Sequence, residues 1–258
     1  MRRAAIVLAL LLTASGAAAD DPSVLRVTPT WPAHWPMDPA PLTSARWPAL
    51  PPPLPPRPPA TDAAARVLAT LAQIERAQRD AAYQHRTDVN ERAGRYRWDC
   101  SGLVSWVVRR AAPRAGRAMG GERLTARGIH RMIERAPRDR ARAGWQRLGH
   151  IEEVLPGDVF AWRTPPGSPS RHTGHTGFVV ERPRRVEGLR DAYAVRVADS
   201  IVGPHEDDSR AEGTAGGLGT GVFVFLTDGE GQATHYGWHG TRTAGYVRTP
   251  VLFGRLWH

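Results

Sequence analysis

The stretch WDCSGLVSW, residues 98 to 106, contains Cys100, the only cysteine among 258 residues. A lone cysteine forms no internal disulfide, so it is an intermolecular bridge, an inert buried residue or a reactive thiol. The apolar residues after it repeat at helical spacing and predict a helix that begins at Cys100 and ends at Pro113: Leu103, Val104, Val107 and Val108. The cysteine is therefore expected in the first turn of a packed helix.

The start of that helix favours a reactive thiol. Its unpaired N–H groups and the positive end of its dipole stabilise a thiolate, so the nucleophile becomes available near neutral pH. Asp99 is placed to cap the helix, while Ser101 and Gly102 are small enough for a substrate backbone to come close. The first-turn N–H groups would also form an oxyanion hole. A buried structural cysteine gains nothing from this position.

A cysteine nucleophile needs a base, and the candidate is His175 in TGHTGFVVE, residues 173 to 181. Strand alternation puts His175, Gly177 and Val179 on one face, so a helix packed on that face would bring Cys100 to His175. A strand histidine is alternatively a surface or satisfied core residue. His172 is the rival base, but its spacing directs it to the opposite face. That geometry also argues against a metal shared by His172 and His175.

Three motifs in order carry a family resemblance: DCSG at 99–102, LPGD at 155–158 and GHTG at 174–177. Together they resemble the NlpC-type cell-wall peptidases (NlpC and its p-sixty relatives), papain-like cysteine hydrolases of bacterial peptidoglycan. The resemblance covers roughly residues 61 to 256. It implies Cys100 as nucleophile and His175 as general base, with no cofactor and no metal. Tyr83 and Ser101 become candidates for the oxyanion or substrate site, although Tyr83 could simply close the first helix.

The third catalytic residue is assigned to Asp199, because an imidazole base works best when a partner holds its second N–H. In the family this residue often comes from the strand after the histidine strand. In YAVRVADS, residues 193 to 200, alternation directs Asp199 inward with Val195 and Val197. An aspartate that merely ends the strand is the alternative. His205 is the rival; it is expected on a loop at the pocket rim, in contact with substrate.

The order of elements predicts an α+β fold in which N-terminal helices pack on a central antiparallel sheet, as in papain-like NlpC-type proteins. Helices are expected from Thr61 or Asp62 to about His85, from Cys100, and over residues 125–135. Strands are expected at 158–162, 173–181, 193–200, 221–228, 233–238 and 250–256. LPGD is expected to be a structural turn whose Asp158 bonds backbone. GGLGTG, residues 216 to 221, is expected to be a flexible loop beside the active-site rim.

The N-terminal region has the composition of an export signal and a linker. Residues 1–19 combine two arginines, an apolar stretch and small residues, as in a cleavable signal peptide without lipoprotein processing. Residues 20–60 form a proline-rich linker, and residues 61–258 the hydrolase domain. The expected location is the periplasm or the exterior. A net charge of +10, carried by arginine alone, fits peripheral contact with anionic wall polymers or membrane surfaces better than nucleic-acid binding.

The leading hypothesis is an exported cysteine peptidase of the cell wall. It would cleave amide bonds in peptidoglycan stem peptides through an acyl-enzyme formed by Cys100 and His175. Two alternatives stay open. An amidase or acyltransferase on the same fold would use the same pair of residues, and a catalytically silent wall-binding module would use neither. The sequence does not indicate an oligomeric state.

Overall fold

The structure is a computed structural model that describes residues 37–39, 50–121, 123–168, 170–189, 191–205, 207–211, 213–238 and 245–258. The predicted signal peptide and most of the predicted linker lie outside these ranges. Of that linker, β1 (Met37–Pro39) pairs with β12 (Gly245–Arg248), and Pro51 accepts a hydrogen bond from Arg184. In the described residues, no helix is long and apolar enough to cross a membrane.

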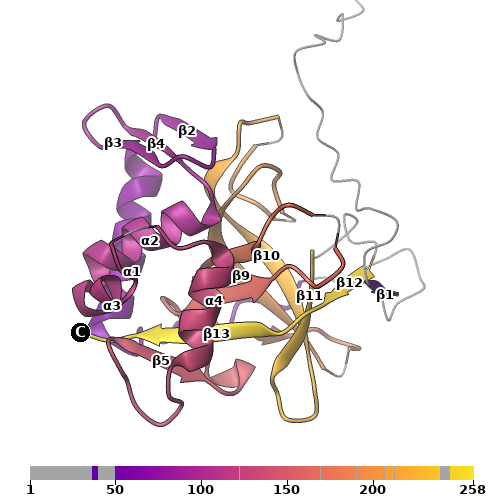
Figure 1. The fold of residues 1–258 in the computed structure, drawn as a ribbon. Helices are drawn as coiled ribbons and strands as arrows, with labels where there is room; N and C mark the ends of the chain where they lie inside the picture. Colours follow the sequence, from indigo (N-terminus) through magenta and orange to yellow (C-terminus); the bar gives the residue numbers. More distant parts are fainter. Residues whose placement is uncertain are drawn as a thin grey trace, which may run out of the picture.

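In the described part of the chain, four α-helices lie against the sheet, and the first, second and fourth begin at side-chain caps (Figure 1). Thr61, Asp99 and Thr125 each accept a backbone N–H of the first turn, as short polar residues do at this position. α3 instead begins at Pro113, whose fixed φ suits a first helical position, so the residue expected to end one helix also starts the next. The helices are α1 (Asp62–Ala77), α2 (Cys100–Ala111), α3 (Pro113–Ala118) and α4 (Ala126–Arg135).

The large sheet has the order β1-β12-β11-β10-β9-β7-β6-β13-β5, with β8 also paired to β9, and every pairing is antiparallel. The short helix η1 (Ile151–Glu153) connects β5 and β6. The fold is thus mixed α+β with a large antiparallel sheet, as predicted. The remaining strands are β5 (Trp145–Leu148), β6 (Val159–Arg163), β7 (Gly174–Val179), β8 (Arg184–Arg185), β9 (Ala192–Ile201), β10 (Gly217–Thr227), β11 (Ala233–Trp238) and β13 (Val251–Leu256).

A small second sheet lies beside the start of α2, where the sequence predicts helix and then a polar connection. It has the order β2-β4-β3, with β2 (Asp80–Tyr83), β3 (Asp88–Asn90) and β4 (Arg95–Trp98). The prediction that the first helix runs to about His85 is wrong: α1 ends at Ala77 because Gly94 accepts the N–H groups of Arg79 and Asp80. Gly94 has φ +66°, a conformation that glycine adopts without strain.

The two faces of the sheet bury different cores. Val104 and Val107 of α2 pack with Phe178 of β7, whereas Val179, the next residue on β7, belongs to the core on the other face. This arrangement corrects the expectation that α2 packs on the face of His175, Gly177 and Val179. The helices cover the opposite face, so Cys100 can reach His175 only from the N-terminal end of α2, beside the start of β7. That end of the helix is therefore the place where the site is built.

Candidate active site

Cys100 lies at the first position of α2, nearly buried at 6% exposure. Asp99 caps the helix as predicted: Gly102 N–H donates to its Oδ1 at 2.8 Å. Ser101 Oγ donates to the same oxygen at 2.9 Å, so this hydroxyl is held by Asp99. The space above Gly102 is filled by Thr87, whose Oγ1 would lie 2.6 Å from an added Cβ. Ser101 is therefore held at the helix start by Asp99, and Gly102 lies against Thr87 in the wall of a pocket of about 450 Å³.

His175 is brought to Cys100, with its side chain 13% exposed. Burial by itself lowers the pKa of His175, but the charge of the Cys100 thiolate and the hydrogen bonds to Asp199 and Cys100 outweigh it and raise this pKa to about 9. His175 Nε2 lies 2.7 Å from Asp199 Oδ2. Because Nε2 is taken by the carboxylate, Nδ1 is the ring nitrogen left for the thiol. The raised pKa favours a protonated imidazole at His175 at neutral pH.

Asp199 is fully buried and holds two histidines with one oxygen. Its Oδ2 lies 2.7 Å from His175 Nε2 and 2.8 Å from His205 Nε2, and its Oδ1 accepts from Arg210 Nη2 at 3.0 Å. Burial disfavours the charge of Asp199, but His205 and Arg210 more than compensate and hold its pKa well below the ordinary range. An ionised carboxylate only accepts hydrogen bonds, so both histidines present N–H groups to it.

His205 does not lie on a loop at the pocket rim, as predicted from the sequence. Its side chain is 0% exposed and packs on Phe223, with the two ring centroids 4.4 Å apart. It contacts the same Asp199 oxygen as His175 and so lies on the side of Asp199 away from the thiol. It is therefore not a substrate contact at the rim. The loop that carries it is tied down by Asp208, which accepts the His205 N–H at 2.6 Å and pairs with Arg210 at 2.8 Å. Asp208 and Arg210 were not predicted as site residues, because only the fold brings Arg210 to Asp199 of β9.

GGLGTG is not a flexible loop, since Gly217 to Gly221 begin strand β10. Its glycines explain how the loop around His205 can lie against the sheet. A Cβ at Gly221 would stand 2.5 Å from His205 Cβ, and a Cβ at Gly219 would stand 2.5 Å from Arg210 Cγ. Gly177 on β7 does the same for Asp199, 2.9 Å from its Cβ. Glycines at positions 177, 219 and 221 are the feature of the sequence that indicates a close approach of other residues to these strands.

Tyr83 lies at the end of β2 and does not close the first helix. Burial raises its pKa, and the negative charges of Cys100 and Asp99 raise it further, so Tyr83 keeps its proton beside the thiol. His85 follows it, exposed, with Nδ1 3.3 Å from Asp99 Oδ2. His172 is exposed outside β7, with its ring centroid 6.0 Å from that of His85. Tyr83, His85 and His172 therefore belong to the surroundings of Cys100. Tyr83 was a predicted site residue, His172 was considered as the rival base, and His85 was not predicted.

Asp158 of the LPGD motif has a structural place, as expected. It is fully buried, accepts the Leu155 N–H at 2.8 Å, and pairs with Arg255 of β13 at 2.9 Å. Gly157 before it has φ +92°, and a Cβ there would stand 2.6 Å from Ala64 O. The motif thus joins the turn before β6 to α1 and β13, on the scaffold that carries the histidine strand.

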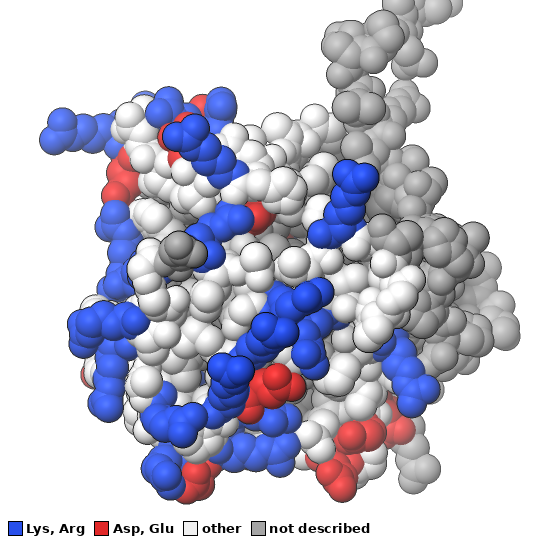
Figure 2. Space-filling view, in the orientation of Figure 1, with Lys and Arg blue, Asp and Glu red and all other residues white. Residues whose placement is uncertain are grey.

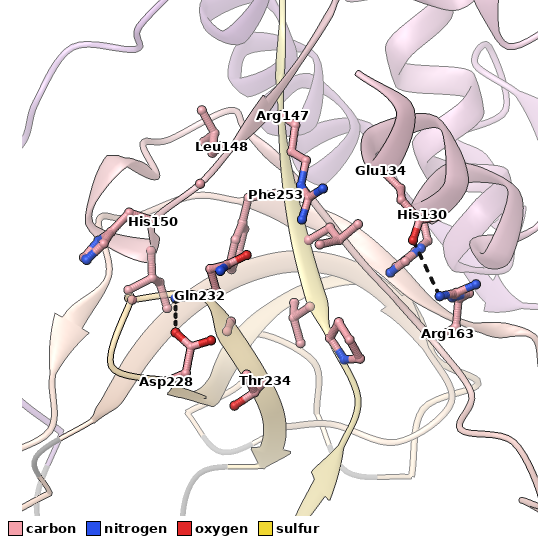
Figure 3. Close-up of a pocket in the computed structure, with 17 residues that line it drawn as sticks. His130, Glu134, Arg147, Leu148, His150, Arg163, Asp228, Gln232, Thr234 and Phe253 are labelled. Atoms are coloured by element: carbon pink, nitrogen blue, oxygen red, sulfur yellow. Dashed lines mark hydrogen bonds and ion pairs between the residues drawn. The ribbon is translucent and has the colours of Figure 1, made fainter. Parts of the chain in front are cut away.

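A different cavity, of about 290 Å³, lies between α4 and β13, and His130 is in its wall (Figure 3). His130 is 1% exposed, and burial together with the charge of Arg163 lowers its pKa to about 4. Figure 3 shows it beside Glu134 and Arg163, which form an ion pair at 3.7 Å. Within the described part of the chain, no group of three or more His, Cys, Asp or Glu side chains is arranged to hold a metal ion.

Comparisons with protein-family models, with curated proteins and with solved structures found no match to this chain. The site is therefore argued from its own geometry. A thiol at a helix start, an imidazole and a buried carboxylate meet in the order that covalent acyl transfer requires.

Proposed function

We propose that this protein is an exported cysteine hydrolase that cleaves amide bonds in peptidoglycan stem peptides. The observation that carries the proposal is the chain of contacts from Cys100 through His175 to Asp199. The raised pKa of His175 favours a protonated imidazole, and the lowered pKa of Asp199 favours an ionised carboxylate. In this proposal the attacking species is the thiolate of Cys100. The substrate class rests on the order of the three motifs and on the basic surface, which suits an anionic wall.

In the first half-reaction, Cys100 Sγ attacks the amide carbonyl carbon and the π electrons move to the carbonyl oxygen. The N–H groups at the start of α2 and the hydroxyl of Tyr83 are the donors available to that oxyanion. His175 then gives its Nδ1 proton to the amide nitrogen, the C–N bond breaks, and the amine leaves. A thioester on Cys100 and a neutral His175 remain.

In the second half-reaction, His175 Nδ1 removes a proton from water, and the resulting hydroxide attacks the thioester carbonyl. The C–S bond breaks, the carboxylic acid is released, and the thiolate returns beside protonated His175. Throughout, Asp199 holds the Nε2 proton and so keeps the ring in one orientation. His205 and Arg210 are positioning residues, since they act on His175 only through Asp199.

The experiment is digestion of purified peptidoglycan, with mass spectrometry of the fragments. We expect new amino and carboxyl ends within the stem peptides with the wild-type chain, and none with Cys100→Ala. Adding an amine acceptor separates hydrolysis from acyl transfer, because a transferase would attach the acceptor to the new carboxyl end. Unchanged fragments over walls of several peptide compositions would contradict the proposal.

A further inference from the structure

Three arginines line a pocket of about 500 Å³ between α4 and the connection from β6 to β7. Arg127 and Arg131 lie one turn apart on α4, and Arg163 is the last residue of β6. Figure 2 shows arginine side chains gathered on the face of the molecule that carries α4. The hollow between them is therefore strongly basic and open to solvent.

This pocket adjoins the candidate active site. Arg163 pairs with Gly174, the residue that precedes His175 on β7. His172, which also lines the pocket, has its ring 6.0 Å from His85, and His85 contacts the Asp99 carboxylate. A molecule that extends a few residues from Cys100 along the start of β7 would thus reach the arginines.

Few carboxylates lie near the arginines of this pocket to neutralise their positive charge. Of the residues that the structure describes, no carboxylate lies within 4.0 Å of the guanidinium groups of Arg127 or Arg131, and Arg163 meets Glu134 only at 3.7 Å. His130, behind Arg163, is kept neutral by its lowered pKa. Like charges gathered in one hollow repel, so an anion bound among them would be favoured.

Hydrogen bonds hold part of the wall opposite α4. Thr164 Oγ1 donates to His172 O at 2.7 Å, and His172 N–H donates to Ser170 Oγ at 3.2 Å. These bonds tie Thr164 to His172 and His172 to Ser170 on one side of the pocket. Side chains and backbone that are already hydrogen-bonded lose less entropy when a ligand binds.

From these observations we infer that the pocket of Arg127, Arg131 and Arg163 binds an oxyanion, a carboxylate or a phosphate, carried by the molecule on which Cys100 acts. The inference rests on the proposed function for its link to the substrate, but not for binding itself. Guanidinium groups on two elements can each present a planar pair of donors to such a group, which an ammonium cannot do.

The test measures binding without turnover, by calorimetry on the full chain with Cys100→Ala. The probes are a stem peptide with free carboxylates, the same peptide with its carboxylates amidated, and a short glycerol phosphate oligomer. Two further proteins add either Arg127→Gln with Arg131→Gln, or Arg117→Gln, to this parent. Arg117 is a matched control, because it is an exposed arginine on α3 away from the pocket. Thermal unfolding by circular dichroism verifies that each protein is folded.

We expect the double variant to bind the better anionic probe about tenfold more weakly, a factor that corresponds to about 1.4 kcal/mol. Its affinity for the amidated peptide should be unchanged, and Arg117→Gln should match the parent throughout. Binding should also weaken with added salt, and less steeply in the double variant. Tighter binding of the peptide than of the oligomer identifies a carboxylate as the ligand, and the reverse identifies a phosphate.

Equal affinities of parent and double variant for both anionic probes would overturn the inference, as would an equal loss for the amidated peptide. Failure of the proposed function is a separate result. If the wild-type chain leaves peptidoglycan uncut while the arginine-dependent binding is present, the pocket stands and the hydrolase does not. If peptidoglycan is cleaved without arginine-dependent binding, the hydrolase stands and the pocket does not.

Discussion

Two histidines of this protein, the largely buried His175 and the buried His130, have pKa values shifted in opposite directions. Burial by itself lowers the pKa of both, because it disfavours a charged ring. His175 nevertheless has its pKa raised to about 9, since it lies between the Cys100 thiolate and the Asp199 carboxylate. His130 faces the cation Arg163, and its pKa falls to about 4.

The comparison shows that burial alone does not decide the charge of a histidine in this fold. At His175 the negative neighbours outweigh the effect of burial, whereas at His130 the charge of Arg163 adds to it. At neutral pH the His175 ring is protonated beside the Cys100 nucleophile, whereas the His130 ring is neutral and lines a cavity next to Arg163. Changes that alter those neighbours should therefore alter the two histidines independently.

The largest effect is expected from Cys100→Ala. It removes the nucleophile, so turnover of peptidoglycan should fall by about 10⁴-fold or more. It also removes the thiolate that raises the pKa of His175, so this pKa should fall well below 9 in an NMR titration. His130→Gln should keep turnover within about threefold, because His130 does not touch the site. Residual turnover near the wild-type rate in Cys100→Ala would show that the thiol is not the nucleophile.

Next in size is Asp199→Asn, which keeps the shape and removes the charge that holds His175, His205 and Arg210. Turnover should fall by about 10²- to 10⁴-fold, since an amide favours the wrong tautomer of the base. Stability should fall by about 3 kcal/mol, because Arg210 then lacks part of its buried counter-charge. Kinetics and urea unfolding measure the two effects.

The matched control for that change is Asp228→Asn, at an exposed position after β10, which should alter neither quantity. His205→Gln is the discriminating variant. It is expected to retain more turnover than Asp199→Asn, because His205 acts only through the carboxylate. If His205→Gln abolishes turnover while Asp199→Asn stays near wild type, the assignment of Asp199 as third residue is reversed.

A third prediction concerns stability against pH, where the two histidines give opposite slopes. Native His175 keeps its proton between pH 6.5 and about 9 while the unfolded chain loses it, so its contribution is lost as pH rises through this window. Native His130 stays neutral where the unfolded chain takes up a proton, so stability is lost as pH falls from 6.5 to about 4. Across each pH window the free energy of unfolding should change by about 3 kcal/mol, since a shift of one pKa unit corresponds to about 1.36 kcal/mol.

Urea unfolding of the wild type and two variants across pH 4 to 9 measures both slopes. His175→Gln should flatten the profile only above pH 6.5, and His130→Gln only below it. If either variant changes both limbs equally, the two rings do not titrate independently.

The smallest expected effect is that of Gly221→Ala, which tests the support behind His175. The added Cβ would stand 2.5 Å from His205 Cβ, so the loop must shift and Asp199 loses part of its hold. We expect a loss of about 1 to 3 kcal/mol in unfolding free energy, as for other overpacked sites, with a smaller fall in turnover. Gly229→Ala is the control, because no atom lies within 4 Å of its added Cβ. Equal stabilities of the two variants would contradict this packing.

Several features of the fold could be predicted because they depend on neighbours in the sequence. The start of α2 at Cys100, its Asp99 cap and the strands β6, β7, β9 and β11 follow from local spacing and alternation. The small sheet β2-β4-β3 could not be predicted, since β2 and β4 are short and pair in parallel across a connection that contains β3. Likewise, nothing near Ala77 in the sequence indicates that Gly94 will end α1.

The sequence by itself determined which reactive groups are present and on which elements they lie: the Cys100 thiol at a helix start, His175 on a strand, and Asp199 pointing inward on another strand. The tertiary structure alone decided how they meet. It placed the helices on the face opposite to His175, so the contact with Cys100 is made from the helix end. It also buried His205 and Arg210 behind Asp199 and gathered three arginines beside His172. These are outcomes of long-range packing and charge, which local periodicity does not encode.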